Sequence, residues 1–337
     1  MWFLWFEFIV CSGVIVFCGT LLAKYGDIIA EKTGMGRAWI GLILMASVTS
    51  LPELITGISS VTIANTPDIA LGDIMGSCVF NLFIIAIMDI LHGPGPIFYR
   101  AEPGHLLSAG FGIILIGLTS ISIMVNDNIP ALRHIGLYTP AIMLIYAIGI
   151  RGIFLFEKKK IAAFVGEVAQ AAQYQHISTG NAVIKYILNA VFIIGAATWL
   201  PFIGDSLAKE TGLGQSFVGT IFIATTTSLP EVAVSIAALK IGAADMAIAN
   251  LFGSNMFNIF ILAIDDIFYI RGPLLSDISI NHAITGLVAI LMTGIAVAGL
   301  SYRLEKKTFL RIGWDAAAIF LAYLLNIFLI YSLRGQG

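Results

Sequence analysis

Charged residues are scarce in this chain. Asp, Glu, Lys and Arg together make up 11% of the 337 residues, whereas hydrophobic residues make up 58% and the mean hydropathy is +0.95. These values exclude an ordinary soluble domain and indicate a polytopic integral membrane protein, so we expect the lipid bilayer as a partner. The net charge is −2, and the only basic run is Lys158 to Lys160, so we expect no nucleic acid partner.

Cysteines and catalytic motifs are also few. The three cysteines, Cys11, Cys18 and Cys78, lie in apolar segments without metal-ligand spacing, and we interpret them as packing residues. The five histidines are dispersed over segment ends and loops, and neither His-Glu-x-x-His nor Gly-x-Gly-Asp occurs. The sequence therefore argues against an intramembrane enzyme, and no cofactor is expected. The apolar N-terminal stretch lacks a basic region and a cleavage site, so we predict a retained first span.

Windows of about 20 apolar residues predict ten membrane-spanning helices and hence an all-α fold. The predicted spans are 3–23, 38–62, 68–91, 105–125, 130–152, 183–203, 215–239, 245–270, 281–301 and 314–333. The longest polar connection joins the fifth span to the sixth. It divides the chain into a first repeat, 1–155, a linker, 156–181, that we expect to be a short cytoplasmic helix, and a second repeat, 182–337.

The two halves of the sequence repeat one another. Thr49-Ser50-Leu51-Pro52-Glu53 recurs in the second half as Thr227-Ser228-Leu229-Pro230-Glu231. Gly76-Ser77-x-x-Phe80-Asn81 recurs, at a spacing shorter by a single position, as Gly253-Ser254-x-x-Phe257-Asn258. Because each half has an odd number of spans, the second half enters the membrane with inverted orientation. Interrupted hydrophobic segments in inverted repeats are typical of a transporter's binding site near the bilayer midplane.

The Pro-Glu motif places a costly carboxylate inside each of two apolar spans. A charge at the bilayer centre costs from about 2.5 to more than 10 kcal/mol, so Glu53 and Glu231 are expected to face a cavity and bind something. Pro52 and Pro230 cannot donate backbone hydrogen bonds, so each helix is interrupted and carbonyl oxygens are released. Carboxylates with neutral oxygens indicate a site for a hard cation. The alternative is a proline kink whose Glu is satisfied by a neighbouring helix.

Neutral oxygens are available around both carboxylates. Hydroxyls come from Ser50 and Ser228, and released carbonyls are expected near Ala46, Thr49, Ala224 and Thr227. In the second motif, the i, i+4 spacing puts Ser77 with Asn81, and Ser254 with Asn258, on one helical face each. Alternatively, the Ser and Thr hydroxyls bond their own helical turn, and the two Asn bond neighbouring helices.

Five further acidic residues lie near span ends, where we expect them to face the interface or an access path: Glu7, Asp89, Asp265, Asp266 and Asp315. Asp73 is different, because it lies four residues before Ser77 and therefore on the same face, about 6 Å farther out.

These motifs resemble the α-repeats of the cation/Ca²⁺ exchanger superfamily, in particular its prokaryotic sodium/calcium exchanger branch. The resemblance covers nearly the whole chain. It implies that Glu53 and Glu231 are shared Ca²⁺ and Na⁺ ligands and that Thr49 and Thr227 add backbone ligands. It also implies Na⁺ ligands at the following residues: Ala46, Ser50, Ser77, Ala224, Ser228 and Ser254. In that fold, spans 1 and 6 slide across the other eight.

Three departures from the family's pattern leave the coupling ion open. Asn81 and Asn258 stand where relatives pair an Asn with an Asp, Asp73 stands where Asn is usual, and Cys78 stands where Asn is common. The expected function is Ca²⁺ export against entering Na⁺, with Ca²⁺/H⁺ exchange as the alternative. A passive cation channel is a more distant alternative, disfavoured by a single internal pair of Glu.

Lysine and arginine predict the orientation. Fourteen of the 18 fall on one side of the predicted membrane, and the four others are Arg133, Lys209, Arg271 and Arg334. The positive-inside rule makes the richer side cytoplasmic. Both termini are then outside, in what we expect to be a prokaryotic cell membrane.

Overall fold

The computed structural model describes residues 1–33, 48–93, 95–99, 101–102, 104–125, 130–168, 177–240, 242–303, 307 and 312–334. Ala46, which precedes the first motif, and Gln173, in the linker, lie outside the described residues. The described part is almost entirely helical, which confirms the predicted all-α class.

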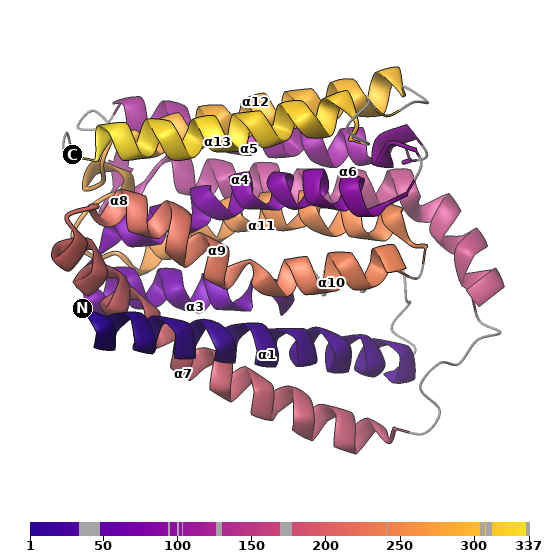
Figure 1. The fold of residues 1–337 in the computed structure, drawn as a ribbon, viewed down its shortest axis with the longest axis horizontal. Helices are drawn as coiled ribbons and strands as arrows, with labels where there is room; N and C mark the ends of the chain where they lie inside the picture. Colours follow the sequence, from indigo (N-terminus) through magenta and orange to yellow (C-terminus); the bar gives the residue numbers. More distant parts are fainter. Residues whose placement is uncertain are drawn as a thin grey trace.

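Long helices run side by side through the molecule, and both termini lie at the same end, at the left of Figure 1. We call this the termini end. The α-helices are α1 (Trp2–Thr33), α3 (Leu51–Ser59), α4 (Pro67–Leu91), α5 (His105–Val125), α6 (Tyr138–Val168), α7 (Thr179–Thr211), α8 (Gln215–Phe217), α9 (Ala224–Thr227), α10 (Leu229–Lys240), α11 (Ala244–Phe268), α12 (Asn281–Tyr302) and α13 (Trp314–Leu333). The π-helices are η1 (Ser60–Ala64) and η4 (Val218–Ile223), and the 3-10 helices are η2 (Ile97–Tyr99) and η5 (Leu274–Ser276).

Eight of the described helices are long and apolar enough to cross a membrane. The broken pair Gln215–Thr227 and Leu229–Lys240, bent by 43°, coincides with the predicted seventh span. Of the predicted second span, residues 48–62 are described, and most of them belong to the short apolar helix Leu51–Ala64. The count of ten spans stays a prediction, because residues 34–47 lie outside the described residues.

Two boundaries differ from the predicted ones. The fifth span was expected to begin at residue 130, but residues 131–136 form the antiparallel hairpin of β1 (Ala131–Leu132) and β2 (Ile135–Gly136). Arg133 has φ of 59°, a left-handed turn conformation that ends any helix there. α6 then runs past the expected end of the span to Val168, so the first part of the linker continues this helix.

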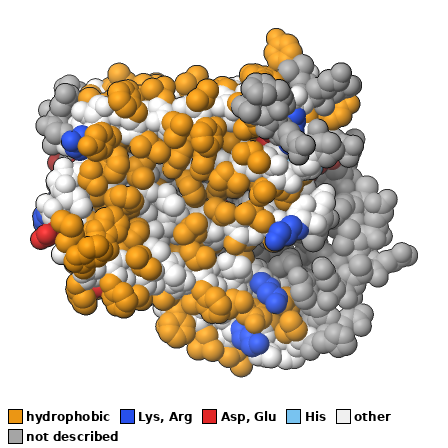
Figure 2. Space-filling model, in the orientation of Figure 1, with side chains coloured by type: hydrophobic (Ala, Val, Ile, Leu, Met, Phe, Trp, Pro, Cys, Tyr) orange, Lys and Arg blue, Asp and Glu red, His pale blue; other side chains and the backbone are white. Residues whose placement is uncertain are grey.

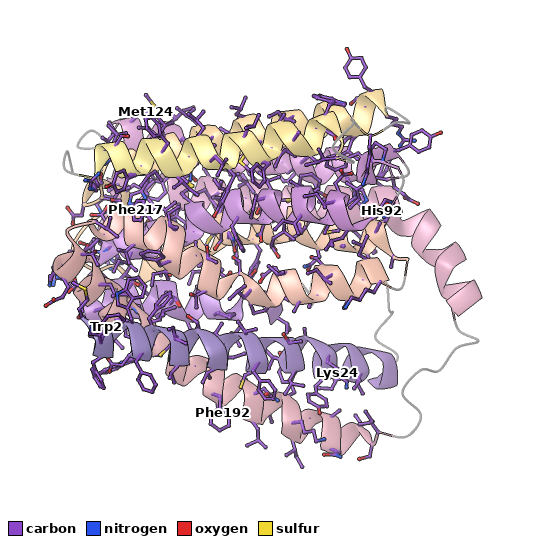
Figure 3. All side chains as sticks on the ribbon, in the orientation of Figure 1. Trp2, Lys24, His92, Met124, Phe192 and Phe217 are labelled. Carbon is purple, nitrogen blue, oxygen red and sulfur yellow. The ribbon has the colours of Figure 1, made fainter. Side chains whose placement is uncertain are left out.

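α4 and α11 form the centre of the bundle. In their most apolar stretches 78% and 72% of residues are buried, against 28% for α1 and 22% for α6. Hydrophobic side chains cover the helices on the face shown in Figure 2, as a lipid-facing surface requires. Figure 3 shows Trp2 near the termini end and Lys24 towards the opposite end, so α1 crosses the molecule.

Polar contacts at the two ends of the bundle recur at positions that correspond in the two repeats. Asp89 accepts hydrogen bonds from the backbone N–H groups of Ile97 at 2.6 Å and Gly313 at 2.7 Å. Its counterpart Asp266 accepts from those of Leu274 at 2.7 Å and Gly136 at 3.0 Å. These carboxylates are fully buried, so of the two surroundings expected for them, the interface and an access path, the interface was wrong.

Two of the five histidines join the halves in the same reciprocal way. Nε2 of His282, on α12, lies 2.9 Å from Oδ1 of Asp68 on α4. Nε2 of His105, on α5, lies 2.9 Å from Oδ1 of Asp245 on α11. Each pair therefore links an acid of one half to a histidine of the other.

Glycines allow α4 to approach η4 closely. A methyl group at Gly72 would lie 2.9 Å from Cα of Gly219, and one at Gly76 would lie 2.7 Å from Cβ of Ala224 and closer still to the carbonyl oxygen of Thr220. Small residues at such a crossing let the backbones touch. This contact holds Ser77, next to Gly76, against the interrupted seventh span.

We expect Gly76→Ala to destabilise the protein by about 1–3 kcal/mol, because the added methyl group has no room between α4 and η4. The control is Gly112→Ala on α5, where nothing lies within 4 Å of the added carbon. The midpoints of thermal unfolding of the two purified variants in the same detergent measure the difference. Equal midpoints would contradict the close approach.

Candidate cation-binding site

Both Pro-Glu motifs lie at helix breaks, as predicted. In the first, α3 begins at Leu51 with Pro52 in its first turn, and Ser50 precedes it with φ −87° and ψ 15°. In the second, Ser228 separates α9 from α10 with φ −88° and ψ 5°. Pro lacks an N–H group, which a first helical turn does not need, so each motif begins a new helix segment. The two breaks pack against α4 and α11.

The two carboxylates are hydrogen-bonded reciprocally across the halves. The hydroxyl of Ser50 donates to Oε1 of Glu231 at 3.2 Å, and that of Ser228 donates to Oε1 of Glu53 at 2.9 Å. All four side chains are fully buried. The structure thus brings together four of the predicted site residues, two from each half.

The second oxygen of each carboxylate has no hydrogen-bond partner. Oε2 of Glu53 and Oε2 of Glu231 are both buried and unpartnered, although most buried polar atoms in proteins are paired. The hydroxyl of Ser254, in the second motif, is likewise buried and has no hydrogen-bond partner. Such oxygens, already removed from water and left free, are ready ligands for a hard cation.

α4 supplies Asp73, Ser77 and Asn81 along one face. Ser77 Oγ lies 2.9 Å from Oγ of Ser228, and the Thr227 hydroxyl donates to Oδ1 of Asp73 at 2.7 Å. The three α4 side chains are buried, and Oδ2 of Asp73 and Oδ1 of Asn81 are unpartnered. Their common face, expected from the spacing of four residues, is confirmed.

The predicted backbone ligands are less free than expected. The carbonyl oxygen of Ala224 accepts from the backbone N–H of Ser228 at 3.1 Å, and the Thr227 hydroxyl lies 3.2 Å from it. A cation would have to compete with these donors, because α9 continues its helical bonding up to Ser228. Thr49 interacts with Glu231 through its side chain. The role of Ala46 stays a prediction.

The two asparagines differ from each other. Asn81 donates to Oδ1 of Asn255 at 3.0 Å, which fits the interhelical alternative, whereas both amide atoms of Asn258 are buried and unpartnered. Asn255 also donates to the carbonyl oxygen of Cys78 at 3.0 Å. Cys78 and Asn255 hold the same place in the two copies of the second motif, so repeat-related residues touch at the centre.

Sequence reasoning missed Asn255 as a central residue. It lies inside the second motif at a variable position, and its correspondence with Cys78 in the repeat was the available signal. Among the described residues, no three His, Cys, Asp or Glu side chains group closely enough to hold a metal ion by themselves. A cation held here would therefore depend on neutral oxygens as well as on the two Glu.

Comparisons with known proteins identify relatives in sequence and in fold. The sodium/calcium exchanger MaX1 of Methanosarcina acetivorans is 23% identical over 344 aligned positions, which cover 91% of this chain and 93% of that protein. The fold matches the H⁺/Ca²⁺ exchanger CAX with a TM-score of 0.72 at 12% identity, covering 98% of this chain and 85% of that one. It also matches the sodium-calcium exchanger NCX_Mj soaked with Na⁺ and Sr²⁺, with a TM-score of 0.62 at 18% identity, covering 97% and 99%.

The sequence matches the family described as sodium/calcium exchanger protein over residues 3–156 and 182–333. The matched ranges contain both Pro-Glu motifs and leave out the polar connection between the halves. This is a family of transporters and not of enzymes. The chain belongs to the sodium/calcium exchanger protein family.

Proposed function

We propose that the protein is a secondary antiporter that exchanges Ca²⁺ for Na⁺ at the site between Glu53 and Glu231. The observation that carries this proposal is the reciprocal bonding of the two motifs. Each carboxylate is held through one oxygen by a hydroxyl of the other half, and each keeps its second oxygen free. Two free, buried carboxylate oxygens favour a bound cation, because unpaired buried charge is costly.

Charge matching supports exchange rather than permanent binding. One Ca²⁺ neutralises two carboxylates, and so do two Na⁺, so either ion can occupy the same site in turn. The neutral ligands are hydroxyl, amide and carbonyl oxygens, which suit both ions. A carrier that alternates between these two loaded states moves Ca²⁺ one way and Na⁺ the other.

The two halves are proposed to be inverted repeats that alternate access to the site. The reciprocal contacts at repeat-related positions support this, because a twofold relation between the halves generates such pairs. α1 and α7, the first and sixth spans, lie along each other at the bottom of Figure 1, and a methyl group at Gly19 of α1 would lie 2.5 Å from Cγ of Pro230. Sliding of α1 and α7 would therefore act directly on a break at the site.

The orientation is proposed from the lysine and arginine distribution, with both termini outside and the linker in the cytoplasm. We expect a single cysteine at Gln173, in a background without the native cysteines, to resist an impermeant thiol reagent in intact cells and to react after permeabilisation. Accessibility to the reagent measures its side. Reaction in intact cells would reverse the assignment.

Glu53→Gln and Glu231→Gln are each expected to reduce Ca²⁺ exchange to background. Either change leaves one negative charge for a dehydrated divalent ion, which is too little to offset its lost hydration. The measurement is uptake of radiolabelled Ca²⁺ into proteoliposomes that contain Na⁺. Glu210→Gln, at an exposed position at the end of α7, is the matched control and should retain exchange.

Near-normal uptake by Glu231→Gln protein that elutes as a monodisperse peak would remove Glu231 from the site. Loss of uptake in Glu210→Gln as well would point to the preparation and not to the site.

Proton coupling is the second candidate, because the centre holds only two carboxylates and has Asn at both 81 and 258. We expect Na⁺ to drive Ca²⁺ transport and Asp73→Asn to weaken Na⁺ coupling more than Ca²⁺ binding. A Na⁺ bound in addition to the two at the centre would need the charge of Asp73. Asn258→Asp should make transport more sensitive to pH, because it adds a titratable carboxyl group to the centre.

The assay imposes a Na⁺ gradient and a pH gradient separately, with the other held at zero, and follows Ca²⁺ uptake. Uptake that ignores Na⁺ but follows the proton gradient would replace the sodium mechanism with Ca²⁺/H⁺ exchange.

A further inference from the structure

Asp265, on α11, is a buried carboxylate with no partner. The side chain is fully buried, and neither of its oxygens has a hydrogen-bond partner. The adjacent Asp266, by contrast, accepts bonds from two backbone N–H groups and from the hydroxyl of Thr139. An ionised carboxylate without a partner is costly in a membrane protein, so such a group marks a binding function.

The carboxylate lies against the broken helix that carries Glu53. A methyl group at Gly57 would lie 2.8 Å from both Cγ and Oδ1 of Asp265 and closer still to Oδ2. Gly57 follows Glu53 by four residues, so it lies on the same face of α3, about 6 Å along the helix. Asp265 thus lies about one helical turn from the central site, towards the termini end.

Two further groups lie on this side of the central site. Asp73 is one turn from Ser77 in the same direction along α4, and it is a second fully buried acidic side chain on this side. Ser60, three residues after Gly57, has a buried and unpartnered hydroxyl. It begins the π-helix η1, and local π-helices often mark functional sites.

The corresponding positions on the other side of the central site carry no acid. In the register that pairs Ser77 with Ser254, Met88 corresponds to Asp265 and Asn250 to Asp73. In the register that pairs the two Pro-Glu motifs, Ser235 corresponds to Gly57. If the fold itself required these carboxylates, both halves should carry them. Because the two carboxylates occur on one side of the central site alone, we interpret them as functional residues of that side.

We propose that Asp265 is the carboxylate of a peripheral Na⁺ site, on the termini side of the Glu53 and Glu231 site. One carboxylate matches the charge of one monovalent cation, and Ser60 supplies a neutral oxygen. Asp73 increases the affinity for the cation through its negative charge. The role of this site in exchange rests on the proposed function, whereas the binding of Na⁺ does not.

Binding is tested first, without transport. In a Glu53→Gln/Glu231→Gln background, Na⁺ should still raise the midpoint of thermal unfolding above that in K⁺ at equal ionic strength. Adding Asp265→Asn should abolish this difference, and adding Ser60→Ala should reduce it. The matched control is Asp277→Asn, which removes an exposed carboxylate near the same end of α11 and should leave the difference intact.

Transport is tested in the otherwise native chain. Asp265→Asn is expected to raise the Na⁺ concentration for half-maximal Ca²⁺ exchange several-fold, with the half-saturating Ca²⁺ concentration unchanged. Ser60→Ala, which keeps every charge, should raise the half-maximal Na⁺ concentration by a smaller factor. If Asp265→Asn does not fold, Ser60→Ala provides the test.

Three results would overturn the proposal. The first is a Na⁺-dependent stabilisation that survives Asp265→Asn, and the second is a shift in half-saturating Ca²⁺ in place of Na⁺. The third is a midpoint of thermal unfolding that rises when the pH is lowered but is the same in Na⁺ and in K⁺. If the native protein transports no Ca²⁺ but passes the thermal test, the proposed function fails while the Na⁺ site stands.

Discussion

The negative charge of Glu53 and Glu231, buried between two helix breaks, is the constraint on which the rest of the structure depends. Neither carboxylate has a cationic side chain as hydrogen-bond partner among the described residues, and each accepts a hydrogen bond from a serine hydroxyl of the opposite half. In the proposed function, a cation from solution supplies the compensating charge in this low-dielectric interior. The surrounding helices serve this requirement: α4 and α11 exclude water and lipid from the centre, and close packing at Gly72 and Gly76 places Ser77 beside the second break.

The reciprocal arrangement also explains how two similar halves make one site. Ser50 donates a hydrogen bond to Glu231, and Ser228 donates one to Glu53. At the ends of the bundle, Asp68 and Asp245 each pair with a histidine of the other half. The departures from this symmetry are therefore informative. The residues that correspond to Asp73 and Asp265 in the other repeat are neutral, Asn250 and Met88, so the two sides of the central site differ in charge although they share a framework.

Much of this could be predicted from the sequence, because the informative residues break strong local rules. Pro and Glu in an apolar span are costly, and their duplication located the breaks and the central carboxylates.

Other features depend on packing that no periodicity encodes. The hairpin at 131–136 reads as part of an apolar span, since its apolar residues outweigh one Arg and one His. Asp265 and Asp266 are adjacent and equally polar, and only the packing shows that Asp266 is satisfied by backbone N–H groups while Asp265 faces Gly57 without a partner. The pairs of Asp with His105 and His282 were hidden because each partner lies in the other half.

The most direct test of the central claim is to locate the bound ion. Crystals soaked with Sr²⁺, a heavier substitute for Ca²⁺, should show one strong anomalous peak within bonding distance of Oε2 of both Glu53 and Glu231, and the peak should disappear when Na⁺ is in excess. A peak bound elsewhere, or an empty centre with the free oxygens of both Glu paired to other side chains, would contradict the account.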